Sequence, residues 1–133
     1  MTVTKILDTF ALIAFFEDEP GADFVRELLL EAESKNIKLA VTVVNLGEIW
    51  YSIARTVSPE QADATVQEIR GMSIEIIDAD WKLTHQAAIY KARGGISYAD
   101  CYAAALAKLR KAEVITGAPE FQKLKDEVTT AWI

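Results

Sequence analysis

Residues 3–16 decide the fold, and they read VTKILDTFALIAFF. A short apolar run, Val3–Leu7, meets a helix-like run, Thr9–Phe16, and Asp8 stands between the two. An acid at the carboxyl end of a first strand lies where open α/β sheets usually place their chemistry. The stretch therefore predicts a strand followed by a helix, with a functional carboxylate at the junction.

The same alternation of strand-like and helix-like runs continues along the chain. We expect strands at Thr4–Leu7, Lys38–Val43, Ser73–Ile77, Glu113–Ile115 and Val128–Ala131. We expect helices at Thr9–Phe16, Gly21–Lys35, Val44–Arg55, from Ser58 to Gly71, Trp81–Ala92, Ser97–Arg110, and from Pro119 onward. Strands that alternate with helices indicate an α/β fold, in which helices flank a central, mostly parallel β-sheet.

Length and composition favour one ordinary globular domain over residues 1–133. The chain is 51% hydrophobic and 26% charged, which is typical of a soluble protein, and its length suits one domain with one core. No apolar run approaches the roughly 20 residues that span a bilayer, and nothing resembles a signal peptide. We therefore expect a cytoplasmic protein with no membrane partner.

The net charge of −6 constrains the partners. Proteins with a broad nucleic-acid-binding surface are usually basic, so we expect no direct DNA binding by this chain alone. A nuclease with a local basic rim is still compatible with this charge. The charge also suits an acidic pocket that a basic partner could plug.

The cysteine and histidine counts limit the kinds of metal site. Cys101 is the only cysteine and His85 the only histidine, so one chain cannot form a disulfide or a Cys/His zinc site. A metal ion would be held mainly by oxygens, which favours Mg²⁺ or Mn²⁺.

Three acids stand in apolar settings: Asp8, Glu48 in the run NLGEIW, and Asp100 in the run SYADCYA. Asp8 follows the first expected strand, Glu48 lies in the helix after the second, and Asp100 opens the helix before the fourth. These places can meet at the carboxyl edge of the sheet. Two carboxylates about 4 Å apart repel by roughly 4 kcal/mol at an effective dielectric constant of about 20. A cluster of three therefore protonates or needs a cation, and a bound Mg²⁺ can activate a water molecule for hydrolysis.

Each acid also has a purely structural interpretation. Asp8 can cap the helix that follows it, Ser97 and Asp100 approximate a capping box, and Glu48 can simply point to solvent. The occurrence of all three acids at one expected edge favours the metal site over three separate structural roles.

From end to end, the chain resembles the PIN-domain ribonucleases, and within them the VapC toxins of bacterial and archaeal toxin–antitoxin pairs. Four segments carry the resemblance: ILDTFAL (residues 6–12), VVNLGEI (43–49), GISYADCYAAALA (95–107) and VITGAPEF (114–121). No single segment is specific, but their order and spacing together are.

The resemblance implies a Mg²⁺- or Mn²⁺-dependent endoribonuclease toxin that hydrolyses RNA phosphodiesters. Its catalytic and metal-binding acids would be Asp8, Glu48 and Asp100. Polar neighbours that could orient water or a carboxylate would be Thr9, Ser97 and Thr116. The implied partners are an RNA substrate, a cognate antitoxin whose tail covers the acids, and a second copy of the chain in a homodimer.

Ala118 departs from this resemblance, because the family usually has Asp there. The position is unusual on local grounds too. Pro119 resembles the first residue of a helix, which makes residue 118 an N-cap, where Ala is a poor choice. The replacement is either natural or engineered, and Glu120 could substitute for the acid in part. We expect weakened metal binding and activity below the family's norm.

Two alternatives come from other functional classes. One is a catalytically inert PIN domain that binds RNA or an antitoxin without cleavage. The other is a phosphotransfer domain with the same α/β alternation. The chain has Phe10 where dehalogenases have a second Asp, and it lacks the acid pair that receivers place before their phosphorylated Asp.

Several other side chains could contact RNA or pack in the protein. Lys91 and Arg93 could bind phosphates, or could be a solvated helix end. Aromatic side chains could stack on bases, but packing in the core or in a dimer is expected for Trp50 and Tyr102. Cys101 is expected to be a core thiol.

Overall fold

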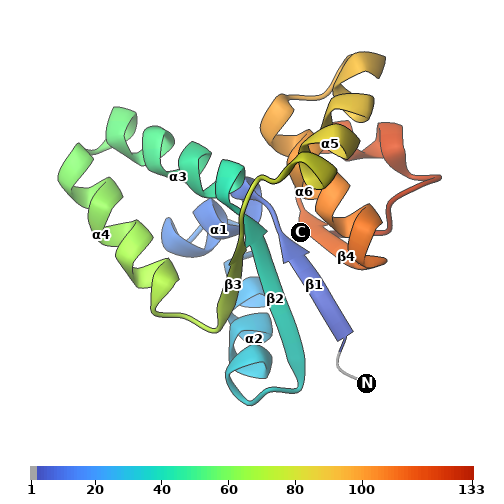
Figure 1. Cartoon of the computed structure of the whole chain (residues 1–133). Helices are drawn as coiled ribbons and strands as arrows, with labels where there is room; N and C mark the ends of the chain where they lie inside the picture. The colour runs from blue at the N-terminus through green and yellow to red at the C-terminus, as the bar shows by residue number, and fades with distance from the viewer. Residues whose placement is uncertain (1–2) are drawn as a thin grey trace.

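The described part of the chain, residues 3–133 of a computed structural model, has a parallel sheet at its centre with helices on both faces (Figure 1). The strands are β1 (Val3–Leu7), β2 (Ile37–Thr42), β3 (Ile74–Ile77), β4 (Glu113–Thr116) and β5 (Thr130–Trp132). They lie in the order β3-β2-β1-β4-β5, and every pairing is parallel. The expected α/β class is confirmed, and the sheet of the described residues is parallel throughout.

The helices match the expected ones with small shifts at their ends. They are α1 (Thr9–Phe16), α2 (Ala22–Glu33), α3 (Val43–Thr56), α4 (Pro59–Arg70), α5 (Trp81–Arg93), α6 (Tyr98–Arg110) and the 3₁₀ helix η1 (Pro119–Leu124). Val43 was expected to end a strand but begins α3, because the Thr42 hydroxyl accepts a hydrogen bond from the Asn45 N–H and caps the helix there. No helix within residues 3–133 is long and apolar enough to cross a bilayer.

The sheet separates two apolar layers, so the single core expected from the length is divided. Ile6 of β1 packs with buried side chains of α5, α6 and η1. The next residue, Leu7, packs on the other face with buried side chains of α1, α2, α3 and α4. Successive side chains of a strand point to opposite faces, so β1 contributes to both layers. The two groups of helices lie on either side of the sheet in Figure 1.

The direction of strand addition reverses between β1 and β4. The chain adds β2 and then β3 on one side of β1, and then adds β4 and β5 on the other side. Ligands of open parallel sheets bind in the crevice outside the carboxyl ends of the strands at such a switch point. Asp8 follows β1, and Gly117 and Ala118 follow β4. The topology therefore brings the first acid and the unusual alanine to this crevice.

Candidate metal site

Asp8 is completely buried at the junction of β1 and α1. Its Oδ1 accepts a hydrogen bond of 2.8 Å from the Ala11 N–H, so the residue caps α1. Its Oδ2 has no hydrogen-bond partner among residues 3–133. An unpartnered buried oxygen carries a desolvation cost, so the capping role accounts for only half of this carboxyl group.

Burial raises the pKa of Asp8 from its ordinary value of 3.8 to about 7. The Thr116 hydroxyl and the Ala11 N–H lower this pKa, whereas the charges of Asp100 and Glu48 raise it. Both of the other predicted acids therefore lie near enough to Asp8 for their charges to raise its pKa.

Asp100 lies in the first turn of α6. The Ser97 hydroxyl accepts a hydrogen bond of 3.3 Å from the Asp100 N–H, which confirms Ser97 as the N-cap. The pKa of the Asp100 carboxyl is raised to about 6, chiefly by burial and in part by the charges of Glu48 and Glu120, whereas Ser97 lowers it. Asp100 is thus a second carboxyl group that is held near other acids.

Glu48 and Asp100 both line one pocket of about 320 Å³. Glu48 is partly buried on α3, and its Oε2 accepts a hydrogen bond of 3.4 Å from the Tyr51 hydroxyl. Asp8 does not line the pocket, although the next two residues do. The lining residues are Thr9, Phe10, Ile13, Glu19, Glu48, Tyr51, Ser52, Asp100 and Ala118.

Ala118 occupies the pocket wall where the family resemblance predicted a fourth acid. It is the N-cap of η1, as Pro119 indicated, and its side chain makes no capping hydrogen bond. The Thr116 hydroxyl instead accepts a hydrogen bond of 2.9 Å from the Ala118 N–H. The wall is therefore apolar at this position.

The donor atoms suit a hard divalent cation. Carboxylate oxygens are the ligands that Mg²⁺ and Mn²⁺ prefer, and a cation would satisfy the free Oδ2 of Asp8 and offset the repulsion among the acids. Among residues 3–133, no three His, Cys, Asp or Glu side chains already converge on one point as metal ligands do. Binding of one cation by all three acids would therefore require a rearrangement of their side chains.

Two residues of this region were not predicted from the sequence. Asn45 is buried, and its side chain donates hydrogen bonds to the Thr9 hydroxyl and the Ala99 carbonyl oxygen. Its only signal in the sequence was its position, because a polar residue stands there one turn before Glu48. Glu19 lines the pocket from the loop between α1 and α2. No local pattern pointed to Glu19, because its place depends on how α1 and α3 pack.

The basic residues before Asp100 are engaged within the protein. The Lys91 ammonium group donates a hydrogen bond of 3.0 Å to the Ile96 carbonyl oxygen, and Arg93 forms an ion pair with Glu127. Both nevertheless remain exposed to solvent in the last turn of α5, which agrees with the expected solvated helix end. They hold the turn that leads into α6.

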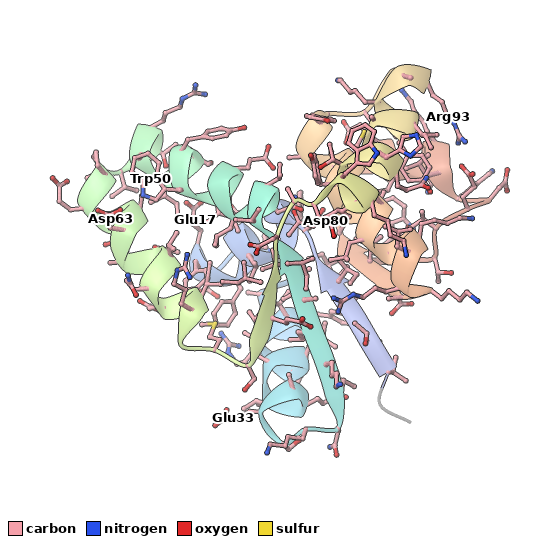
Figure 2. The ribbon with its side chains drawn as sticks, viewed as in Figure 1. Glu17, Glu33, Trp50, Asp63, Asp80 and Arg93 are labelled. Atoms are coloured by element: carbon pink, nitrogen blue, oxygen red, sulfur yellow. The ribbon has the colours of Figure 1, made fainter. Side chains whose placement is uncertain are left out.

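The predicted packing residues differ in their surroundings. Tyr102 and Cys101 are buried, as expected. Trp50 is not a core residue: it is 37% exposed, and its Nε1–H donates a hydrogen bond of 2.8 Å to Asp63. This bond ties α3 to α4, and Figure 2 shows the two side chains together.

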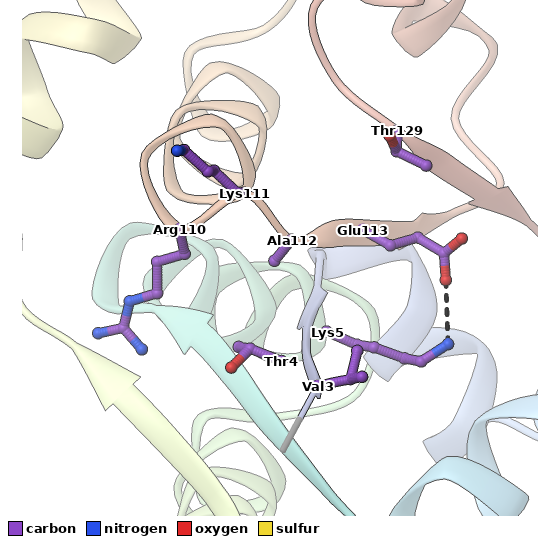
Figure 3. A pocket seen from close by; sticks show the side chains of 8 residues that line it. All are labelled: Val3, Thr4, Lys5, Arg110, Lys111, Ala112, Glu113 and Thr129. Atoms are coloured by element: carbon purple, nitrogen blue, oxygen red, sulfur yellow. Dashed lines mark hydrogen bonds and ion pairs between the residues drawn. The ribbon is translucent and has the colours of Figure 1, made fainter. Parts of the chain in front are cut away.

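A larger pocket of about 780 Å³ lies at the opposite edge of the sheet, beside the first residues of β1 and β4 (Figure 3). Its Lys5 and Glu113 form an ion pair of 3.0 Å, and its Arg110 pairs with Glu75 at 3.1 Å. None of the three predicted acids lines it. Its paired charges make it a poorer candidate for chemistry than the smaller pocket.

The sequence profile of the PIN domain matches residues 5–127. This protein therefore belongs to the PIN domain family. Membership replaces the phosphotransfer alternative that the α/β alternation had left open. A search of curated proteins found no match.

Solved structures from toxin–antitoxin systems share the fold. VapBC2 from Rickettsia felis, bound to a DNA fragment from its promoter, gives a TM-score of 0.74 at 20% identity, over 97% of this chain and 98% of that chain. DNA-bound VapBC from Salmonella typhimurium gives 0.75 at 18% identity, over 98% of each chain. The sarcin–ricin loop cleaving toxin VapC20 from Mycobacterium tuberculosis gives 0.71 at 16% identity, over 90% and 94%. At these identities, the likeness shows a common fold.

Proposed function

We propose that this protein is a divalent-metal-dependent endoribonuclease toxin of a toxin–antitoxin pair. Asp8, Glu48 and Asp100 are its catalytic, metal-binding acids. The observation that carries the proposal concerns Asp8, which is buried at the switch point. Its Oδ2 has no hydrogen-bond partner among residues 3–133, and the charges of the other two acids raise its pKa. The PIN family match and the RNA-cleaving toxin among the structural relatives support it.

A bound Mg²⁺ or Mn²⁺ would supply an activated water and charge stabilisation for the leaving oxygen. The protein's own part is to hold the acids. The Ala11 N–H fixes one oxygen of Asp8, and Ser97 fixes the backbone at Asp100. The Thr9 hydroxyl is hydrogen-bonded to Asn45, and the Ser97 hydroxyl is hydrogen-bonded to the Asp100 N–H. Thr9 and Ser97 therefore position the acids rather than orient water.

The pocket walls suit an unpaired stretch of RNA. Phe10 and Tyr51 line the pocket and are 41% and 45% exposed. Aromatic faces stack on bases of single strands, and RNA is most often read where its bases are unpaired. We infer that a base beside the cleaved phosphodiester stacks on Phe10 or Tyr51.

The partners follow from the charge of the pocket. Glu19, Glu48 and Asp100 line it in a chain of net charge −6, which favours a basic group on an inhibitory partner. An antitoxin tail fits this description, and two of the solved relatives are VapBC assemblies. We further propose a homodimer that acts in the cytoplasm.

Ala118 makes the activity weak. The metal site has three acids where the family resemblance implies four, so the bound ion is held less tightly. Glu19 lines the same pocket, and the charge of Glu120 reaches Asp100, so either could replace part of the missing charge. The alternative, an inert PIN domain that binds RNA or an antitoxin, is favoured by the same alanine and by the lack of converging ligands within residues 3–133.

Cleavage of a mixed RNA substrate with Mn²⁺ tests the proposal, with Asp8→Asn and Ala118→Asp as variants. We expect slow cleavage by the unmodified chain, none by Asp8→Asn, and faster cleavage by Ala118→Asp. Binding of RNA without cleavage by any of the three proteins would favour the inert alternative. Cleavage that persists unchanged in Asp8→Asn would refute the proposed site.

A further inference from the structure

Asn45 is a buried polar side chain whose hydrogen-bonding groups are all used. It lies in the first turn of α3 and is completely buried. Its Oδ1 accepts a hydrogen bond of 2.6 Å from the Thr42 hydroxyl. Its Nδ2 donates hydrogen bonds of 3.1 Å to the Thr9 hydroxyl and 3.1 Å to the Ala99 carbonyl oxygen.

These bonds connect the chain segments that carry the three acids. Thr9 directly follows Asp8, and Ala99 directly precedes Asp100. Asn45 itself stands about one turn before Glu48 on α3. The Thr9 hydroxyl also donates to the Asn45 carbonyl oxygen at 3.4 Å, so the link between α1 and α3 runs in both directions.

An amide is well suited to this position. It offers an acceptor and two donors on one planar group. Here one hydrogen bond goes to Thr9 of α1 and the other to Ala99 of α6. An apolar side chain would leave the partly buried Ala99 carbonyl oxygen and the buried Thr9 hydroxyl without this partner. Apolar packing of α3 against α1 and α6 is not directional, whereas a hydrogen bond fixes distance and angle.

We propose that Asn45 is a positioning residue that sets how α1, α3 and α6 present Asp8, Glu48 and Asp100 to a cation. The inference rests on the proposed metal function, but the tie between the helices stands on the hydrogen bonds themselves. Removal of a group that orients metal ligands without binding the metal itself usually changes metal affinity by about 10- to 100-fold.

The test replaces Asn45 with leucine, which has a similar shape and no donors. Ile69→Ala is the control, since Ile69 is a fully buried residue of α4, its truncation weakens the core, and α4 carries none of the three acids. Two quantities are measured on the full chain: Mn²⁺ affinity by calorimetry, and amide hydrogen exchange without metal. The informative amides are those of Ala11, which is held by Asp8, and of Asp100, which is held by Ser97.

We expect Asn45→Leu to lose at least about tenfold in Mn²⁺ affinity and to exchange faster at both amides than Ile69→Ala does. Mn²⁺ affinity and exchange that match the control would overturn the inference. If the unmodified chain binds no Mn²⁺, the exchange decides alone. Faster exchange at both amides then supports the tie and assigns the failure to the proposed metal function, whereas unchanged exchange overturns the tie. If Asn45→Leu does not fold, Asn45→Ser is judged by the same two outcomes.

Discussion

At the scale of single residues, Asp8 caps a helix with one carboxylate oxygen and still has a second oxygen that a cation could bind. One carboxylate oxygen caps α1, and the other has no partner within residues 3–133. The cap holds the side chain in place, and burial keeps its free oxygen away from water. The residue is therefore costly to the fold when it is ionised without a cation nearby.

This cost predicts how the metal-free protein responds to pH. The pKa of Asp8 is about 7 in the folded protein and 3.8 ordinarily, so the folded state holds its proton more tightly. The contribution of Asp8 to the stability of the fold is highest below about pH 4, falls as the pH rises, and levels off above about pH 7. Asp100, with its pKa raised to about 6, adds to the same trend. The contribution of Asp8 is at most about 4 kcal/mol.

Thermal unfolding in a chelator between about pH 4 and pH 8 measures this trend. Asp8→Asn should flatten it and raise the unfolding temperature at the alkaline end, because asparagine also caps helices well. Asp80→Asn is the matched control, since Asp80 caps α5 by the same kind of bond, to Leu83 at 2.9 Å, but is exposed. Equal slopes in Asp8→Asn and the unmodified chain would contradict the account.

Ala118 gives a second residue-scale prediction. Ala118→Asp should restore an N-cap for η1, which is worth about 1 kcal/mol, and should add a carboxylate to the pocket wall. We expect Mn²⁺ to raise the unfolding temperature of this variant more than that of the unmodified chain. Glu120→Gln serves as the comparison, because it removes a nearby charge that does not line the pocket. If Mn²⁺ stabilises Ala118→Asp no more than the unmodified chain, the missing acid is not the weak point of the site.

At the scale of elements, the candidate site lies at the junctions that follow β1, β2 and β4. Substitutions of Gly117, which follows β4, and of Gly47, in the helix that follows β2, test the role of these junctions. A Cβ on Gly117 would meet ring atoms of Phe10 at 2.3 Å, whereas a Cβ on Gly47 would meet nothing within 4 Å. Gly117→Ala should therefore displace Phe10, lower stability and weaken RNA binding. Gly47→Ala should stabilise α3 by about 1 kcal/mol and leave RNA binding unchanged. Urea unfolding and fluorescence anisotropy with a labelled RNA give the two quantities. A normal RNA affinity in Gly117→Ala would remove Phe10 from the proposed binding surface.

The same elements show what the sequence can predict. Ser58, Ser97 and Pro119 mark helix starts by local chemistry, and the structure begins helices there. The boundary at Val43 was missed because Thr42 continues a strand pattern and also caps a helix. Long-range ties were beyond local patterns: Asn45 reaches Ala99 across 54 positions of the sequence, and Glu19 reaches the pocket through helix packing. The acids were found because each stands out in an apolar run, but their burial and mutual distance depend on the whole fold.

At the scale of the molecule, the sheet assigns different roles to its two edges. The carboxyl edge has the switch point, the small pocket and three acids, whereas the opposite edge has the larger pocket with paired charges (Figure 3). The larger pocket is not lined by any of the three predicted acids. The topology and the unpartnered oxygen of Asp8 favour the smaller pocket.

Mn²⁺ titration of the full chain by calorimetry tests most directly whether the acids at the carboxyl edge bind a divalent cation. Asp8→Asn, Glu48→Gln and Asp100→Asn would be compared with Glu113→Gln at the opposite edge. We predict saturable Mn²⁺ binding that each of the first three variants weakens by at least about tenfold and that Glu113→Gln leaves unchanged. Absence of Mn²⁺ binding by the unmodified chain and by Ala118→Asp, or equal binding by Asp8→Asn, would contradict it.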